Sequence, residues 1–238
     1  MKRALPVFAL VVGLALTGCS GNDSKPAESG DKTEAGTSTS AAPQASQLSK
    51  EQLTTVIEST KVDGKTFKAM DAAAGGDAAN TAMKALESAE FSPAECKDLS
   101  LAALNVSQQS GGTTVTGVAT DNTLSVGLSS FADEDAAAKQ LSTASKITEK
   151  CGEVTVKASG MEMTMTSETF DATVDGADES VGVRASMEAG GQPAFTTETV
   201  TSRTGNNLVS AVNLAPEGKE EAAVTTAQSF LEALKNAG

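Results

Sequence analysis

Three methionines stand two residues apart in the segment Met161-Glu162-Met163-Thr164-Met165. Side chains at this spacing project from one face of an extended strand, so the three thioethers would lie together. Soft sulfur ligands suit Cu(I), but methionine also fills irregular gaps in a core or cleft wall and adapts to apolar ligands. The chain has no histidine, the usual companion ligand for copper. The pattern therefore favours a core or cleft wall. An apolar ligand-binding surface at Met161, Met163 and Met165 is the second interpretation and a copper site the third, and we expect no metal and no cofactor.

The missing residue types exclude several kinds of catalytic site. Without histidine, neither a Ser-His nor a Cys-His nucleophilic pair is possible. The sequence also lacks the nucleophile elbow, the phosphate-binding loop and the dinucleotide fingerprint. A glycosidase needs only two carboxylates, but Trp and Tyr, on which sugar rings stack, are absent. The sequence predicts a protein that is not an enzyme and has no catalytic residues.

The chain is strongly acidic, with a formal net charge of −13 and an isoelectric point near 4.5. Such a surface repels phosphates, so nucleic acid is not expected as a partner. Two acidic clusters, at 133–135 and at Asp175, Asp178 and Glu179, lack the spaced oxygen ligands of a calcium loop. We expect the first to begin a helix and the second to form a solvated turn.

The N-terminus has the pattern of an export signal. Lys2 and Arg3 precede an apolar run from Leu5 to Leu16, which is too short to span a bilayer core of about 30 Å. The sequence Leu-Thr-Gly-Cys that ends at Cys19 resembles the lipobox of bacterial lipoproteins; an ordinary signal peptide is the alternative. The resemblance implies that residues 1–18 are removed and that Cys19 is lipidated. The lipid would then hold the protein on the extracytoplasmic side of the cell membrane.

A tether and one domain follow the lipidation site. Residues 19–47 carry the lipidated cysteine and then only small and polar side chains and proline, which cannot bury enough surface to fold. Such a linker has an r.m.s. reach of roughly 30 Å. Residues 48–238 fit a single domain. Because residues 1–18 hold two positive charges and no negative ones, their removal changes the formal charge from −13 to −15.

Two cysteines remain in the domain. In an exported protein Cys96 and Cys151 most simply form a disulfide, and both fall on apolar helical faces. Two buried free thiols and a dithiol redox site are the alternatives. A redox pair would usually stand in a Cys-x-x-Cys arrangement, so we expect the disulfide.

Helix signals occur in five places. Ser49 and Gln52 form a capping box ahead of an apolar face made by Leu53, Val56 and Ile57. Further helices are expected at 77–89, from a second capping box at 92–95 onward, from about 131 to 151, and at 217–236.

Strand signals fill the rest of the domain. Alternating apolar and polar residues predict strands at 124–129, 153–158, 161–170, 180–188, 194–202 and 207–214. Glycine pairs or Gly-Asn between them indicate hairpin turns, and 180–188 has a clear two-faced pattern. Helices, then strands joined by tight turns, then a helix predict an α+β fold, with an antiparallel sheet flanked by helices and one helix-connected crossover.

The order of these features resembles a known family. Pro93 and Cys96, then 129–151, 176–184 and 203–212, follow the pattern of actinobacterial lipoproteins of the PknH-like extracellular sensor-domain family. The resemblance covers most of the domain. It implies an α+β domain in which the sheet and helices frame a cleft, with a role in sensing or binding outside the membrane.

Two functions remain open at this point. The first is a ligand-binding or sensor-like module without catalysis, whose cleft takes a small or lipidic molecule. The second is a protein-interaction component of a cell-envelope complex with no small-molecule site. An enclosed apolar cleft of roughly 300–1,000 Å³ would favour the first, and a filled interior with an exposed apolar patch would favour the second.

Overall fold

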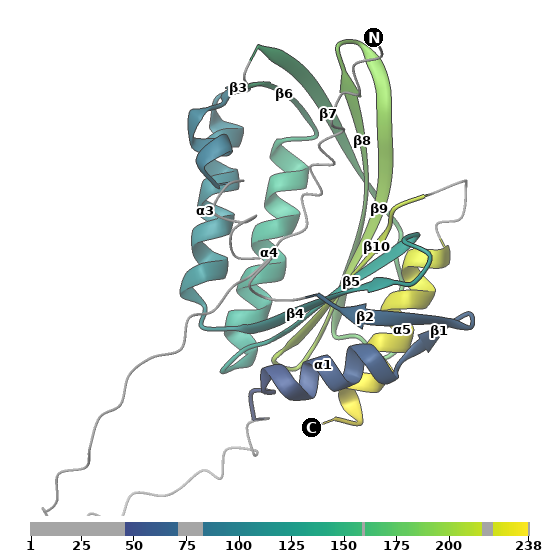
Figure 1. Ribbon diagram of the computed structural model, residues 1–238. Helices are drawn as coiled ribbons and strands as arrows, with labels where there is room; N and C mark the ends of the chain where they lie inside the picture. Colours follow the sequence, from purple (N-terminus) through teal and green to yellow (C-terminus); the bar gives the residue numbers. More distant parts are fainter. Residues whose placement is uncertain (1–45, 71–82, 159, 216–220, 238) are drawn as a thin grey trace, which may run out of the picture.

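The computed structural model describes residues 46–70, 83–158, 160–215 and 221–237, with the backbone alone for 103–109. These residues build a ten-stranded antiparallel sheet with the strand order β1-β2-β4-β5-β10-β9-β8-β7-β6-β3 (Figure 1). The strands are β1 (Lys61–Val62), β2 (Lys65–Ala69), β3 (Glu90–Ser92), β4 (Thr113–Ala119), β5 (Leu124–Ser130), β6 (Glu153–Ala158), β7 (Met161–Phe170), β8 (Glu179–Ala189), β9 (Gln192–Thr204) and β10 (Asn207–Asn213). The helices are α1 (Lys50–Ser59), α3 (Glu95–Gln109), α4 (Glu134–Lys150) and α5 (Glu221–Lys235), with a short helix at 83–88. The predicted α+β fold with an antiparallel sheet is confirmed.

Helices α3 and α4 each lie in a connection between strands that are far apart in the sheet. After β5 it passes through α4 and enters β6, and β6 to β10 then run back as a meander until β10 pairs with β5. Before that, the chain runs from β3, at one edge of the sheet, through α3 to β4, which pairs with β2 near the other edge. The sequence predicted only one such crossover. The other was missed because β3 and β4 were not recognised as strands.

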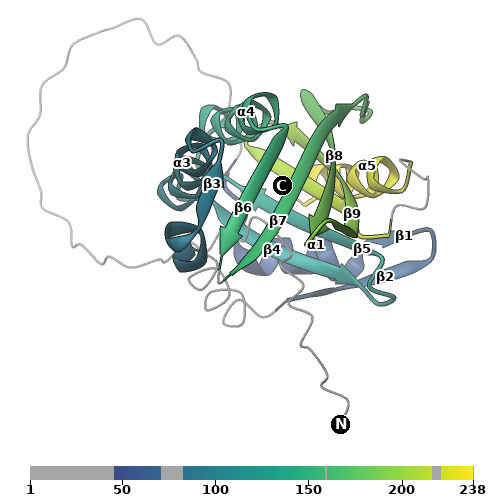
Figure 2. The same cartoon turned by 90° about the horizontal axis from the view of Figure 1, so that it is seen from above.

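Helices α1 and α5 cover one face of the sheet (Figures 1 and 2). Their buried side chains pack on alternate residues of β4, β5, β9 and β10, which form the largest core. The rings of Phe67 and Phe230 meet edge to face in this core, with centroids 5.0 Å apart. The predicted apolar face of α1 is confirmed, because Leu53, Val56 and Ile57 are all buried.

Helices α3 and α4 lie side by side on the other face (Figures 1 and 2). Two smaller clusters of buried residues form beneath them. One contains Phe131, Ala137, Leu141 and Leu208, and the other contains Cys96, Cys151 and Val154. Cys96 and Cys151 form the predicted disulfide, with their Cα atoms 5.8 Å apart. The bridge joins the first turn of α3 to Cys151, the C-cap residue of α4.

Local signals set the helix ends. The Ser49 side chain accepts the N–H of Gln52, and the Gln52 side chain accepts the N–H of Ser49, so the predicted capping box is present. Asp133 caps α4 by accepting the N–H of Ala136 at 2.8 Å, and Cys151 ends that helix as predicted. Within the described residues, no helix is long and apolar enough to cross a membrane.

Several expected elements differ from the structure. The helix expected at 77–89 is seen only at 83–88, since 77–82 lie outside the described residues. The second capping box is not formed, because Ser92 pairs with Thr155 as the last residue of β3 and α3 begins only at Glu95. Strands β1, β2 and β4 were also missed. The turn at Asp63 and Gly64, both with positive φ, was a usable hairpin signal for the first two.

The two-faced pattern expected for 180–188 is also not reproduced in the burial of β8. The strand is half-buried on both sides, and its single buried residue is Gly182. The reason is that both sides are covered at the start of the strand. A side chain at Gly182 would meet Phe170 and Ala172 at 2.8 Å, while Val181 packs against the cluster beneath α4.

Candidate functional site

Four strands bring large apolar side chains into one line. The sheet register pairs Val154 with Met165, Met165 with Met187, and Met187 with Phe195. Directly opposed residues in antiparallel strands share a face and have Cβ atoms about 4.5–5.5 Å apart. Exposure increases along this line, from 3% at Val154, through half-buried Met165 and Met187, to 41% at Phe195. We call these four residues the methionine row.

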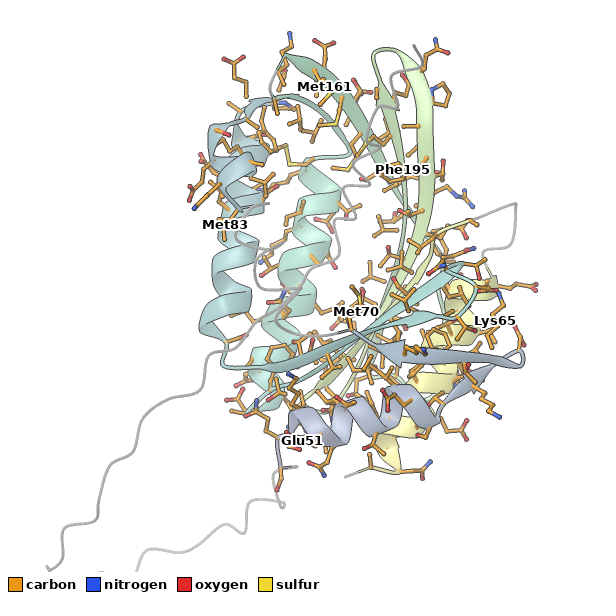
Figure 3. All side chains as sticks on the ribbon, in the orientation of Figure 1. Glu51, Lys65, Met70, Met83, Met161 and Phe195 are labelled. Atoms are coloured by element: carbon orange, nitrogen blue, oxygen red, sulfur yellow. A yellow bond between two sulfur atoms is a disulfide. The ribbon has the colours of Figure 1, made fainter. Side chains whose placement is uncertain are left out.

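The three methionines singled out from the sequence share one face of β7 but have different surroundings. Met165 belongs to the methionine row. Met163 is half-buried and pairs with Val156 and Ala189. Met161 begins β7 and is 62% exposed, at the end of the sheet away from α1 (Figure 3). Met161 is therefore not part of a core, and a ligand-binding role for the three residues stays a prediction.

The buried end of the methionine row is held by the disulfide. Val154 lies in the same cluster as Cys96 and Cys151, which are 1% and 5% exposed. Phe91 and Val156 pack against this cluster from neighbouring strands. One end of the row is thus a rigid, covalently bridged part of the fold, and the other end is open to solvent.

An open groove lies on the same side of the sheet, between α4, the end of β7, the connection at 171–178 and the start of β8. Its volume is about 510 Å³. Glu149, Asp171, Asp178 and Glu179 are exposed carboxylates in its lining. Hydroxyl and apolar side chains complete it, Val181 among them. No lysine or arginine of the described residues lines the groove, and we call it the acidic groove.

A second open groove, of about 610 Å³, lies between α1 and α5. Glu51, Gln52, Thr55 and Asn236 are among its lining residues. It lies at the α1 end of the molecule, where Glu51 is labelled in Figure 3. Neither of these two grooves in the described part of the chain is the enclosed apolar cleft that a small-molecule module would need.

The reverse side of β6 to β9 carries several ion pairs. Lys157 pairs with Glu162 at 2.9 Å, and this hydrogen bond raises the pKa of the lysine. Arg184 donates to Glu198 at 2.9 Å and to Glu168 at 3.3 Å. Glu198 is 1% exposed, so its carboxylate is buried beside its partner. These pairs were not foreseen, because they join residues of different strands.

The remaining predicted residues can be placed briefly. Cys19 lies outside the described residues. Within the described part, no group of three or more His, Cys, Asp or Glu side chains could hold a metal ion. Asp133 and Glu134 begin α4 as predicted. Asp178 is a hydrogen-bond partner as well as a turn residue, since it accepts from Arg203 at 3.1 Å and from the Gly205 N–H at 2.7 Å.

The sequence did not single out Met187, Phe195 or the acidic groove as functional. Alternation placed Met187 on the same face as Val181, but nothing local shows that β8 lies between β7 and β9. That register alone brings Met187 between Met165 and Phe195. The turn at Gly190 and Gly191 was the one available signal, since it predicts that the two flanking strands pair.

Comparison with known proteins gives distant structural matches. No protein-family model matches the chain, and no curated protein matches it significantly. The extracellular domain of PknH from Mycobacterium tuberculosis matches with a TM-score of 0.38 and 16% identity, over 55% of this chain and 69% of that one. An uncharacterised Rv0999-ortholog protein from Mycobacterium smegmatis matches with a TM-score of 0.42 and 15% identity, over 81% and 98%. The predicted resemblance to the PknH-type extracellular domain is thus confirmed as a distant structural similarity, which carries no function with it.

Proposed function

We propose that this chain is a lipid-anchored extracytoplasmic protein that acts by binding and not by catalysis. The lipobox-like sequence at Cys19 supports the anchor. The disulfide between Cys96 and Cys151 supports an oxidising compartment outside the cytoplasm, since such bridges persist there. The binding surface we assign is the methionine row.

The row carries the proposal because it leaves large apolar side chains in water at one place. Met165 and Met187 are half-buried and Phe195 is 41% exposed, although they are direct neighbours across three strands. A contiguous exposed apolar patch is typical of a binding site. Methionine side chains are flexible and polarisable, so they adapt to apolar partners of different shape.

The shape of this surface favours a protein partner over an enclosed small molecule. The row crosses an open sheet face, and the two grooves described above are open as well. A small or lipidic ligand held in a closed cleft remains the second candidate, on the strength of the half-buried methionines.

Photo-crosslinking in the native host tests the proposal. A photoreactive phenylalanine analogue replaces Phe195 in the full-length chain, and the same analogue replaces Met70 as a control. Met70 is also exposed, at 50%, but it directly follows β2 and donates its backbone N–H to Thr116 of β4, so it lies several strands away from Phe195. We expect an adduct at position 195 that is absent at position 70. Mass spectrometry of the adduct distinguishes a protein partner from a small molecule. Equal adducts at both positions, or none at 195, would contradict the proposal.

A further inference from the structure

The methionine row is continuous with an apolar stripe along β8. Val181, Val183, Ala185 and Met187 share one face, because alternate residues of a strand do so. At about 3.3 Å per residue the stripe is roughly 20 Å long. Val183, Ala185 and Met187 are half-buried, and none of them packs against the three buried clusters of the described residues.

The stripe runs from the methionine row to the acidic groove. Val181, at the end of the stripe away from Met187, is part of the groove lining. Among the described residues, the charged side chains that line the groove are Glu149, Asp171, Asp178 and Glu179, and the adjacent Arg203 is already paired with Asp178. The whole chain is acidic too, with a formal charge of −13. A partner that lies along β8 therefore meets an apolar stripe and then a negative potential.

The Met187 end of the stripe, which pairs with Phe195, lies far from the point where the predicted tether joins the domain. Leu48 is buried beside α1, and the Gln47 side chain donates to Gly111 O, Thr113 Oγ1 and Ser130 O at 2.9–3.2 Å, which fixes this junction. Met161 and Phe195 lie at the opposite end of the molecule from α1 (Figure 3). A partner of the methionine row thus approaches from the side away from the junction.

We propose that the stripe on β8 and the acidic groove together dock a cationic amphipathic helix of a partner protein. This inference rests on the proposed binding function of the methionine row. A stripe of roughly 20 Å matches a helix of about 14 residues at 1.5 Å per residue. The apolar side of such a helix lies on Val183, Ala185 and Met187, and its lysine or arginine side chains reach the carboxylates of the groove. Helix-in-groove recognition uses this division between apolar anchors and charged rim.

Defined peptides test the docking. The probe is a fluorescent 14-residue peptide of leucine and lysine, with leucine at the i, i+3, i+4 and i+7 positions, and the matched control contains glutamate in place of lysine. The mature lipidated chain is held in phosphatidylcholine nanodiscs, and binding is followed by fluorescence anisotropy. We expect the lysine peptide to bind and the glutamate peptide not to bind, with affinity falling as salt rises.

Two sets of variants locate the contact. Met165→Gln/Met187→Gln keeps side-chain length but adds polarity, and should weaken binding about tenfold. Glu149→Gln/Asp171→Asn/Glu179→Gln should weaken it by a similar factor and flatten the salt dependence. Glu51→Gln/Glu58→Gln/Glu232→Gln removes as many exposed charges from α1 and α5 and should change little. Unchanged melting temperatures show that each variant is folded.

Other results would overturn the inference. Equal binding of the lysine and glutamate peptides would show that charge plays no part in the docking. If the α1–α5 variant loses as much affinity as the variant with three groove carboxylates replaced, the acidic groove is not the site of contact. Native mass spectra that show a dimer or a retained phospholipid, either of them lost in Met165→Gln/Met187→Gln, would replace the cationic helix with another occupant. That last outcome leaves the proposed binding function standing, whereas an absent adduct at position 195 would remove both.

Discussion

Asp121 lies in the turn between β4 and β5 and holds two partners at once. Lys65 Nζ lies 2.9 Å from Asp121 Oδ2, and the Thr123 hydroxyl donates to Oδ1 at 2.8 Å. The hydrogen bond from Lys65, followed by those from Thr123, lowers the pKa of Asp121 to about 2. These hydrogen bonds keep the Asp121 carboxylate ionised, and the ion pair with Lys65 joins β2 to the β4–β5 turn.

The lowered pKa predicts a direction of pH dependence. Because the folded pKa is lower than the ordinary 3.8, the Asp121 contribution to stability is complete above that value and is lost as pH falls through about 2. NMR titration of the carboxyl carbons should show the low midpoint, and Asp121→Asn should remove the corresponding part of the acid sensitivity. A midpoint near 4 would contradict the prediction.

The exposure of the methionines predicts their order of oxidation. Hydrogen peroxide converts a thioether to a sulfoxide and is itself reduced to water, and access controls the rate. Met161 and Met70, at 62% and 50% exposure, should react before half-buried Met163 and Met165. Peptide mapping by mass spectrometry after brief peroxide treatment measures this order. Faster oxidation of Met165 than of Met161 would show that the methionine row is more open than described.

At the scale of elements, the two faces of the sheet are covered by two helix pairs that are held in different ways. Helices α1 and α5 share one large buried core with the strands beneath them. Helices α3 and α4 rest on two small clusters, and a disulfide joins them to each other. Among the described residues, the clusters beneath α3 and α4 contain fewer buried apolar side chains than the core beneath α1 and α5, so we expect this second cover to depend more on its crosslink.

Removal of the disulfide should therefore destabilise the domain. The bridge closes a loop with a sequence separation of 55 residues, and the chain-entropy model gives about 4 kcal/mol for a loop of this length. Guanidinium chloride unfolding with and without a reductant measures the change, and Cys96→Ala/Cys151→Ala should reproduce the reduced curve. A midpoint that does not move would show that packing alone holds α3 and α4.

Close packing of α1 on β4 gives a second prediction for the elements. A Cβ at Gly117 would lie 2.5 Å from Ile57 Cγ2, so Gly117→Ala forces the helix or the strand to move. Such overpacking costs about 1–3 kcal/mol. Gly127→Ala is the matched control in β5, since its Cβ would have no neighbour closer than 3.9 Å. The difference between the two unfolding free energies isolates the packing term, and equal values would contradict it.

At the scale of the whole molecule, the fold separates the tether from the proposed binding surface. The junction with the tether is fixed beside α1 by Gln47 and Leu48. The exposed ends of β7 and β9 lie at the far end of the domain (Figure 3). The predicted tether, with a reach of roughly 30 Å, would leave the methionine row free to meet partners beyond the membrane surface.

The anchor itself is tested by lipid labelling. Cells grown with an alkyne-tagged palmitate should incorporate the tag into the wild-type chain, because the lipobox-like sequence predicts acyl chains at Cys19. Cys19→Ala should abolish the label, whereas Cys96→Ala/Cys151→Ala should retain it. Label that persists in Cys19→Ala would show that the modification lies elsewhere or that the lipobox is not used.

Features of the fold that depend on residues close together in the sequence were predicted well, and features that depend on contacts between distant segments were not. The strands β6 and β7, the cap at Ser49 and the helix start at 133–135 depend on neighbouring residues, and they were predicted closely. Strand β4 was missed because Gly117 and several threonines dilute its apolar alternation. The capping box at Ser92 failed because pairing with Thr155 on a distant strand takes the same residue.

By itself the sequence determined the α+β class, the capping box at Ser49, the pairing of Cys96 with Cys151 and the absence of histidine chemistry, because composition, local spacing and cysteine number are properties of the chain. Only the tertiary structure decided which strands are neighbours. It placed Met187 between Met165 and Phe195, exposed Met161, and brought Glu149 near Glu179. The physical reason is that sheet register is a contact between segments far apart in the chain, and no local pattern contains it.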